Sequence, residues 1–415
     1  MTTPAQTERQ PVRPRTSAGE PVIEAARLTK VFGPSHESAP SRRLLASRWG
    51  SRSGSRQVVA IDDVSFSVAS GELFVIMGLS GSGKSTLLRM LNRLVEPTSG
   101  ELRMDGRNVA ALTDSELRDL RNRKVNMVFQ HFALFPHRTV LENAAYGLHV
   151  RRVPAAQRLE RANWALRTVG LADRADAFPG ELSGGMRQRV GLARALATDA
   201  EILLMDEPFS ALDPLIRREM QDLLLRLQHE LRRTIVFVTH DLNEAMRLGD
   251  RIMVMRAGRV VQTGTAAEIL SAPADDYVAD FVSDVDRSRV LTAGAVVREP
   301  LVLANEADHP RDVLRLLGNI EAVGAYVVDG DGRLLGVARH DLLARATESD
   351  SSLRECLCDE YERATSDTPL SELFSLVDKG IVPLAVIDGN GKLLGVLPRA
   401  AMLAALTDPR KVVHA

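Results

Sequence analysis

Residues 78–85 of this 415-residue chain read Gly78-Leu79-Ser80-Gly81-Ser82-Gly83-Lys84-Ser85, which fits the pattern G-x-x-x-x-G-K-[ST]. Glycines without a Cβ allow backbone N–H groups to turn inward around an anion. In such a loop the lysine reaches the β- and γ-phosphates of a nucleotide, and the final hydroxyl can bind Mg²⁺. The stretch therefore predicts a nucleoside triphosphate site that uses Lys84 and Ser85.

The segments on either side of this loop fit the same interpretation. Residues 73–77 form a short apolar run that is typical of a buried strand. Residues 86–94, which begin with Thr86, have helical spacing and would place a helix N-terminus under the phosphates. A Gly/Ser loop without a ligand is the alternative, and the strand–loop–helix context argues against it.

Composition excludes several classes of protein. Lys plus Arg is 53 and Asp plus Glu is 54, so the net charge of −1 gives no general attraction to nucleic acid. The sequence holds no apolar run of about 18 residues that would cross a membrane. Residues 1–20 lack the apolar core of a secretion signal, and we expect them to be disordered. Cys356 and Cys358 are interpreted as inert thiols in a reducing cytoplasm.

The length predicts two or three domains. Over residues 21–272, apolar strands alternate with helices, which indicates an α/β domain with a largely parallel sheet covered on both faces. Residues from about 131 to 185 are richer in helix and predict a lobe inserted into this domain. The arginine-rich residues 35–57 predict a solvated loop, and contact with an anionic membrane is the alternative.

The C-terminal third contains an internal repeat. Residues 327–337 recur as residues 386–396, and each copy reads as a strand, a D-G-x-G turn and a second strand, with helical stretches before and after. We expect a linker at 273–287, and the two copies at 288–347 and 350–408 should pack as one pseudo-symmetric module.

Two carboxylates follow an apolar strand at residues 202–205. Asp206 and Glu207 would then lie at the carboxyl edge of the sheet, beside the phosphate loop, where α/β proteins bind ligands. Asp206 could complete the Mg²⁺ shell with Ser85, and Glu207 could orient and deprotonate an attacking water.

A second anion-binding helix N-terminus follows from residues 182–188. Ser183 is a good helix N-cap, but Gly184 and Gly185 are poor helix formers that allow an anion to approach the backbone. Because the phosphates already have a cradle at residues 78–85, this segment suggests a γ-phosphate offered by another subunit.

Taken together, these motifs make the chain resemble an ABC transporter ATP-binding subunit over about residues 21–270. The resemblance implies a P-loop NTPase core with an inserted helical lobe, ATP and Mg²⁺ as ligands, and hydrolysis of ATP. It also assigns site residues by motif, which are the Walker A residues Gly78, Leu79, Ser80, Gly81, Ser82, Gly83, Lys84, Ser85 and Thr86, the Q-loop Gln130, the signature residues Ser183, Gly184, Gly185 and Gln188, the Walker B residues Asp206 and Glu207, the D-loop Asp213, the switch His240 and the adenine-stacking Phe32.

In that family, Glu207, His240 and Gln130 would act in catalysis, and Ser85, Asp206 and Gln130 would hold Mg²⁺. Two such domains pair head to tail, so that each ATP lies between the Walker A loop of one and the signature segment of the other. The resemblance further implies an integral membrane permease and a substrate-binding protein as partners, a peripheral location at the cytoplasmic face of the membrane, and no nucleic acid.

Within the family, the sequence is most similar to ATP-binding subunits of glycine betaine/proline importers. The arginine-rich insertion, the Walker A region and the stretch 213–217 read like theirs, and the C-terminal repeat resembles a tandem CBS pair of α+β repeats. Some CBS pairs bind adenine nucleotides through a threonine and an aspartate after the last strand. The first copy of the repeat offers only Asp341 and the second offers neither, so dimerisation and ionic-strength sensing are alternatives.

Two other functions compete with this one. An importer of another small solute, such as methionine, would share the ATPase domain, although related sugar and polyamine subunits usually end in a β-barrel. A soluble ABC ATPase acting on nucleic acid or ribosomes would usually carry two cassettes, long coiled coils or zinc sites, and this sequence has a single phosphate loop and balanced charge.

Overall fold

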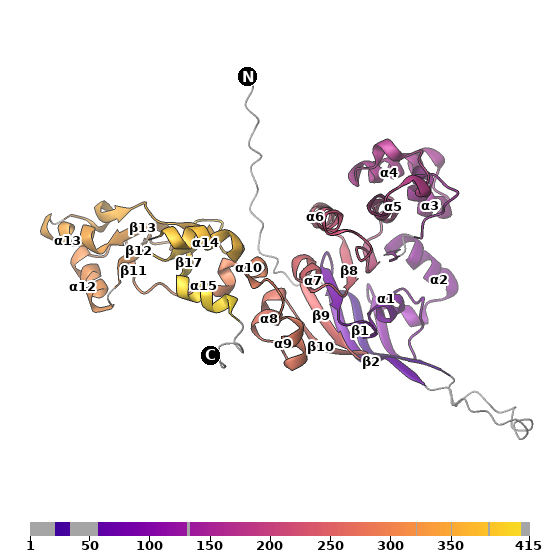
Figure 1. Cartoon of the computed structure of the whole chain (residues 1–415), viewed down its shortest axis with the longest axis horizontal. Helices are drawn as coiled ribbons and strands as arrows, with labels where there is room; N and C mark the ends of the chain where they lie inside the picture. Colours follow the sequence, from indigo (N-terminus) through magenta and orange to yellow (C-terminus); the bar gives the residue numbers. More distant parts are fainter. Residues whose placement is uncertain are drawn as a thin grey trace, which may run out of the picture. The chain divides into compact units, whose positions relative to one another are not determined.

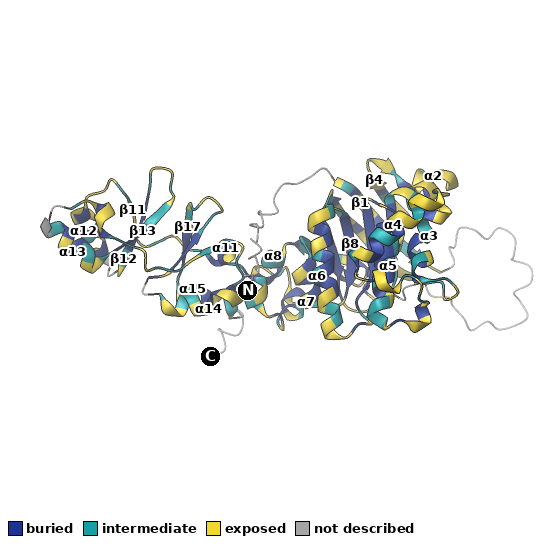
Figure 2. Ribbon diagram, turned by 90° about the horizontal axis from the view of Figure 1, so that it is seen from above, coloured by how far each residue is buried: buried dark blue, intermediate teal, exposed yellow. Residues whose placement is uncertain are grey.

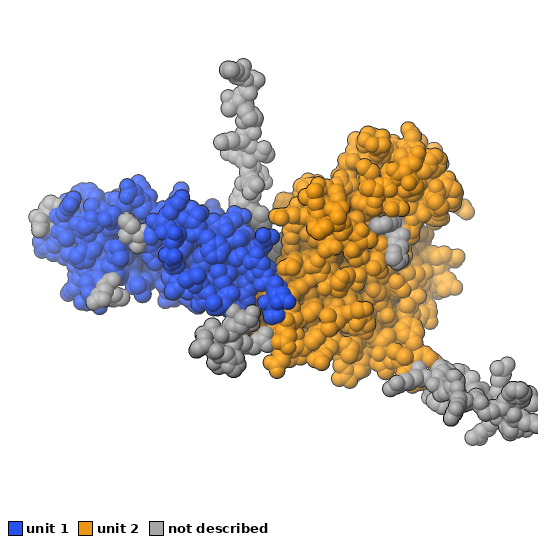
Figure 3. Space-filling model, in the orientation of Figure 1, with its two compact units in different colours: residues 1–16, 283–415 blue, residues 17–282 orange. Residues whose placement is uncertain are grey.

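The computed structural model describes residues 21–33, 57–130, 133–320, 322–349, 351–380 and 382–407. The expected disordered tail at 1–20 and nearly all of the arginine-rich insertion lie outside these ranges. The described residues form two compact units, 21–282 and 283–407, which Figure 3 colours separately.

A six-stranded sheet forms the centre of the first unit, with strand order β10-β9-β3-β8-β7-β6. Its strands are β3 (Leu73–Met77), β6 (Val125–Val128), β7 (Ile202–Asp206), β8 (Thr234–Thr239), β9 (Arg251–Arg256) and β10 (Arg259–Gly264). All neighbours pair in parallel except β9 and β10, which form an antiparallel edge hairpin. The central strands are buried along their whole length, as Figure 2 shows in dark blue.

Helices cover both faces of this sheet, because successive side chains of each strand point to opposite sides. Leu204 of β7 packs in one core with Leu87 and Leu88 of α1 (Lys84–Leu91). Leu203 faces the other side, towards α5 (Gly184–Ala197) and α6 (Pro214–Leu231). The expected α/β class with a largely parallel sheet is confirmed.

A second, antiparallel sheet completes the core on the α1 side (Figure 1). Its strand order is β2-β1-β4-β5, with β1 (Pro21–Phe32), β2 (Val58–Ala69), β4 (Ser99–Met104) and β5 (Arg107–Asn108). After a short 3₁₀ turn, η1 (Val109–Ala111), a capping box at Thr113 starts α2 (Asp114–Asp119), which continues as the π-helical segment η2 (Leu120–Lys124). The sequence predicts a helix over residues 114–121, and the structure is helical throughout this range, with a change to π-helical hydrogen bonding at Leu120.

The helical lobe contains α3 (Val140–Val150) and α4 (Ala155–Thr168), followed by the 3₁₀ turns η3 (Ala172–Arg174) and η4 (Pro179–Glu181). Both α3 and α4 pack against α5, so the lobe supports the helix that begins with the signature segment. The unit ends with α7 (Leu242–Leu248), α8 (Ala266–Ser271) and α9 (Asp276–Phe281). Thus α9 lies within residues 273–287, where the sequence suggested a linker.

The second unit repeats one order of elements. After α10 (Arg287–Val290) and α11 (Ala293–Val296), the first copy has β11 (Leu303–Asn305), α12 (Pro310–Ile320), β12 (Gly324–Val328), β13 (Leu334–Arg339) and α13 (His340–Ser349). The second copy begins with the turn η5 (Leu353–Cys356) and β14 (Leu357–Cys358). It then has β15 (Arg363–Thr365), α14 (Leu370–Lys379), β16 (Leu384–Ile387), β17 (Leu393–Leu397) and α15 (Arg399–Leu406).

The two copies exchange strands at their sheet edges. β14, near the start of the second copy, pairs with β13 of the first. Arg298, near the start of the first copy, exchanges two backbone hydrogen bonds of 2.8 Å with Val396 of the second. The two D-G-x-G turns also meet, with Arg333 opposite Lys392. Each copy therefore contributes backbone pairing to the sheet of the other.

Candidate functional site

The glycine-rich loop joins the end of β3 to the start of α1. A Cβ on Gly78 would lie 2.2 Å from Met255 O, and one on Gly83, the N-cap of α1 with φ +100°, would lie 2.5 Å from Ala60 O. Gly81 has φ +79° with open space around it. Close packing therefore requires glycine at the two ends of the loop, while its middle leaves room for a ligand beside the helix N-terminus.

The Lys84 side chain folds back into this loop. Its ammonium donates to Gly78 O at 2.9 Å and to Leu79 O at 3.2 Å, and the side chain is buried. Burial lowers the pKa of Lys84, and the carboxylates of Glu207 and Asp206 oppose that shift. The cation is thus held at the centre of the loop, with two carboxylates close by.

Ser85 and Asp206 meet across the sheet edge. The Ser85 hydroxyl donates to Asp206 Oδ1 at 2.7 Å, and Arg89 of α1 lies 3.4 Å from Asp206 Oδ2. Asp206 is 3% exposed, which keeps its carboxylate beside the loop. A hydroxyl and a carboxylate are oxygen donors of the kind that Mg²⁺ prefers. Sequence analysis missed Arg89, which is marked only by its place one helical turn after Ser85.

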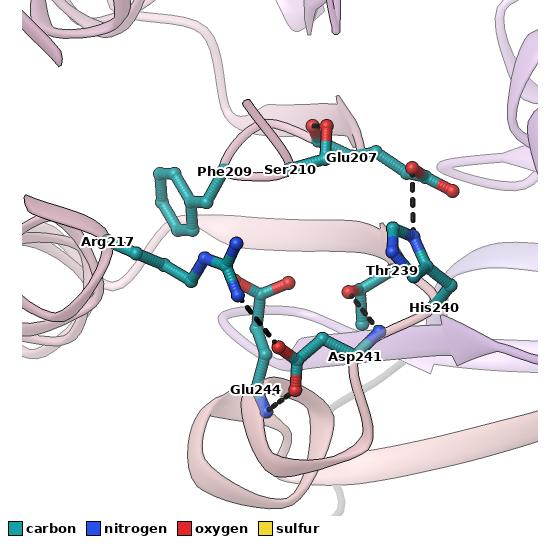
Figure 4. A pocket seen from close by; sticks show the side chains of 8 residues that line it. All are labelled: Glu207, Phe209, Ser210, Arg217, Thr239, His240, Asp241 and Glu244. Carbon is teal, nitrogen blue, oxygen red and sulfur yellow. Dashed lines mark hydrogen bonds and ion pairs between the residues drawn. The ribbon is translucent and has the colours of Figure 1, made fainter. Parts of the chain in front are cut away.

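Glu207 and His240 face one another beyond the ends of β7 and β8. Nδ1 of His240 lies 3.0 Å from Glu207 Oε2, as Figure 4 shows. Glu207 has φ +45°, an uncommon conformation for a residue with a side chain, and its N–H donates to Val238 O. This turn directs the Glu207 side chain away from the strand and towards the histidine.

Gln130 follows β6 and reaches the same edge. Its amide nitrogen lies 3.4 Å from the Ser210 hydroxyl, which itself donates to Glu207 O. Ser210 is the first residue of the stretch 210–213 that matches the D-loop, and sequence analysis gave it no role of its own. The family resemblance implies that residues 131–136, after Gln130, form a contact surface for a partner helix. His131 and Phe132 of this stretch lie outside the described residues. Phe135 packs against Tyr146 of α3, with 4.4 Å between ring centroids.

The signature segment starts α5 as predicted from its N-cap. Met186 N–H donates to the Ser183 hydroxyl at 3.3 Å. Gly184 has open space around it, whereas a Cβ on Gly185 would lie 2.5 Å from Ile216 Cγ2 on α6. Gln188 is buried. Among the described residues, no hydrogen bond or ion pair joins this segment to residues 78–85 of the same chain.

The two remaining candidate site residues, Asp213 and Phe32, lie on different elements. Asp213 caps α6 by accepting hydrogen bonds from Leu215 N and Ile216 N. Phe32, at the end of β1, is 43% exposed, and the Lys30 ammonium lies 5.0 Å from its ring centroid. Its ring is therefore available for stacking.

A small pocket opens behind Glu207 and His240. It is lined by residues of the loop after β7, the end of β8 and the starts of α6 and α7, which are Glu207, Phe209, Ser210, Arg217, Thr239, His240, Asp241 and Glu244 (Figure 4). Arg217 and Asp241 form an ion pair of 3.0 Å within it. Burial raises the pKa of Glu244, against the effect of hydrogen bonds from Thr239 and Gln221. Sequence analysis missed this cluster, although Asp241 directly follows His240.

Comparison with known proteins agrees with the geometry. The model of the ABC transporter family matches residues 61–210, and that of the CBS domain matches 293–347 and 355–408. The glycine betaine transport ATP-binding protein OpuAA of Bacillus subtilis is 44% identical, over 95% of this chain and 94% of that protein. The glycine betaine/proline betaine transport system ATP-binding protein ProV of Salmonella typhimurium is 45% identical, over 92% of this chain and 97% of that protein.

A solved structure extends the comparison to the first unit. The ATP-binding cassette MJ0796, in a dimeric post-hydrolysis state bound to ADP and Pi, has a TM-score of 0.51 and 34% identity, and it covers 59% of this chain and 98% of that one. None of the described helices has the length and apolarity that crossing a bilayer requires.

Proposed function

The chain belongs to the ABC transporter family, as an ATP-binding subunit of the glycine betaine transport type, and on this premise we propose how its residues couple ATP hydrolysis to import. The observation that carries the proposal is the convergence of Ser85, Asp206, Glu207 and His240 on the carboxyl edge of the sheet, beside the glycine-rich loop. Ligands of α/β proteins bind at this edge.

Each residue has a role that follows from its position. The loop 78–86 would hold the triphosphate of ATP through backbone N–H groups, the α1 N-terminus and the Lys84 ammonium. Phe32 would stack on adenine. Ser85, Asp206 and Gln130 would hold Mg²⁺, which neutralises charge on the phosphate oxygens. Glu207 would take a proton from the attacking water, and His240 would hold the Glu207 carboxylate and contact the γ-phosphate.

A second copy of the chain completes the site. Ser183 and Gly184 are exposed or half-buried at a helix N-terminus and make no contact with the described phosphate loop of their own chain. We infer that they, with Gly185 and Asp213, face the ATP of a partner copy, while the buried Gln188 supports the segment from within its own chain. ATP would then close the dimer, and loss of the γ-phosphate would weaken it.

The proposed transported solute is inferred from the names of the similar proteins. We propose glycine betaine, proline or a related quaternary amine, selected by a substrate-binding protein and carried by an integral membrane permease. This chain would bind that permease at the cytoplasmic face of the membrane. Its CBS pair would regulate transport, and salt offers one route, because contacts between exposed charges weaken as the Debye length falls from about 10 Å at 0.1 M to about 3 Å at 1 M salt.

The enzymatic part can be tested on the purified chain. Glu207→Gln should bind ATP, form a stable dimer with ATP and hydrolyse it at least about 100-fold more slowly than the parent. Lys84→Ala should lose ATP binding and ATP-dependent dimerisation together. Hydrolysis by Glu207→Gln at the parent rate would remove the general base from its assigned position.

A further inference from the structure

We propose that Arg217 is a positioning residue, which ties the D-loop to the switch-histidine loop and so keeps His240 aligned with Glu207. The inference deepens the proposed function and rests on it, because it concerns how that ATP site is held. No motif assigns a role to Arg217. The evidence lies in the hydrogen bonds that its guanidinium makes.

Arg217 joins two loops that are distant in sequence. Its NH1 donates to Asp241 Oδ2 at 3.0 Å, and its NH2 donates to Leu212 O at 3.2 Å (Figure 4 shows the first of these). Leu212 lies in the D-loop, and Asp241 directly follows His240. One planar guanidinium with fixed donors therefore links both loops at once, which a flexible ammonium cannot do as well.

Asp241 passes this restraint on to His240. Its backbone N–H donates to Thr239 Oγ1 at 2.9 Å, and its Oδ1 accepts from Glu244 N, which caps α7. The backbone N–H of Asp241 thus holds the turn before it, its carboxylate holds the start of α7 after it, and Arg217 holds the carboxylate. Because His240 lies between Thr239 and Asp241, the direction of the His240 ring depends on these hydrogen bonds.

The ion pair between Arg217 and Asp241 is partly buried. The side chains of Arg217 and Asp241 are 29% and 32% exposed, so solvent screens this pair less than a fully exposed one. Phe209, in the loop after β7, also lines the pocket beside Arg217. A change in the D-loop would therefore be transmitted to the Glu207–His240 contact through one side chain.

A second ion pair between α6 and α7 supplies a matched control. Arg247 of α7 pairs with Asp222 of α6 at 2.6 Å and donates to Gln221 Oε1. This ion pair also links α6 to α7, with similar exposure, but it touches neither loop. Removing Arg247 tests whether loosening the two helices is sufficient to slow hydrolysis.

The test measures kcat and KM for ATP on the full chain for Arg217→Met, Arg217→Lys, Asp241→Asn and Arg247→Ala. Asparagine at 241 still caps α7, so that variant removes the charge but keeps the helix start. We expect Arg217→Met to lower kcat about 10- to 100-fold with KM changed less than about twofold, and Arg217→Lys to recover part of the loss. Arg247→Ala should retain the parent kcat.

A double-mutant cycle isolates the contact. If Arg217 acts through Asp241, the combined Arg217→Met and Asp241→Asn variant should be little slower than the slower single variant. Parent kcat in Arg217→Met and Asp241→Asn, an equal loss in Arg247→Ala, or a loss that appears only as raised KM would overturn the inference. Failure of the proposed function would give a different result. Hydrolysis of ATP by the parent would then not depend on Glu207, so Glu207→Gln would hydrolyse ATP at the parent rate.

Discussion

The hydroxyl of Ser85 donates a 2.7 Å hydrogen bond to Asp206, a residue 121 positions later in the chain. The contact joins the start of α1 to the end of β7, and so connects the phosphate loop to the strand that ends in the Asp206-Glu207 pair. Two oxygen donors held together in this way would form one side of the proposed Mg²⁺ site.

Asp206→Asn should abolish most Mg²⁺-dependent hydrolysis. Asparagine fills the same space but removes the charge, and we expect kcat to fall by about 100-fold or more because charge on the phosphate oxygens is then less well neutralised. ATPase activity over a Mg²⁺ titration measures this. Arg89→Gln is the control, because it removes the half-exposed partner of Asp206 and should change kcat less than about fivefold. Equal losses in both variants would contradict the assigned role.

Ser183→Arg should block ATP-driven dimerisation without unfolding the domain. Ser183 is exposed at the start of α5, so arginine meets no obstacle within its own chain but would occupy the place of a partner's γ-phosphate. Analytical ultracentrifugation with ATP in the Glu207→Gln background measures dimerisation. Ser183→Asn retains a good N-cap and should dimerise far better than the arginine variant. A stable ATP-bound dimer of Ser183→Arg would contradict the head-to-tail arrangement.

The sequence predicted the central strands closely, because buried parallel strands are continuous apolar runs. Leu73–Met77 and Thr234–Thr239 have the bounds that their composition indicates. The strand exchange between the CBS copies could not be predicted in this way. Arg298 and Val396 lie almost a hundred residues apart, and their pairing depends on backbone hydrogen bonds that no side-chain pattern records.

The motifs likewise indicated the side chains to which we assign the chemistry, but not the contacts that hold these side chains in place. Glu207 and His240 each follow a predicted strand, so their proximity could be expected from sheet topology. Arg217 was missed because an arginine in the first turns of an amphipathic helix usually faces solvent. Its contacts with Leu212 O and Asp241 arise only when α6 and α7 pack together.

Gly395→Ala should loosen the connection between the CBS copies. A Cβ there would lie 2.5 Å from Arg298 O and 2.6 Å from Val297 Cγ2, and overpacking of this kind costs about 1–3 kcal/mol. Hydrogen exchange at the amides of Arg298 and Val396 should become faster. Gly389→Ala is the control, since a Cβ there has open space. Unchanged protection in Gly395→Ala would show that the exchanged pairing does not form.

Glu244→Gln should alter how stability depends on pH. Burial raises the pKa of Glu244 above its usual value of 4.5, with Asp241 adding to the shift and Arg217 opposing it. The folded protein therefore binds this proton more tightly than the unfolded chain does. The stability it contributes is present below the unfolded pKa and is lost as pH rises through the folded pKa.

Glutamine keeps an acceptor for Gln221 without this titration. The free energy of unfolding of Glu244→Gln should match the parent at about pH 4 and exceed it at about pH 8. Denaturant titrations at both pH values measure the difference. Glu230→Gln replaces an exposed carboxylate on α6 and should show no such trend. A constant difference between Glu244→Gln and parent at both pH values would contradict the raised pKa of Glu244 in the folded protein.

The central claim is that ATP hydrolysis at Glu207 drives import of a quaternary amine. The most direct measurement is uptake of radiolabelled glycine betaine by cells that contain this chain with its permease and substrate-binding protein, at low and high osmolarity. We predict uptake by the parent that increases with osmolarity and is absent in Glu207→Gln. Equal uptake in Glu207→Gln, or no uptake while the assembled complex hydrolyses ATP, would contradict the claim.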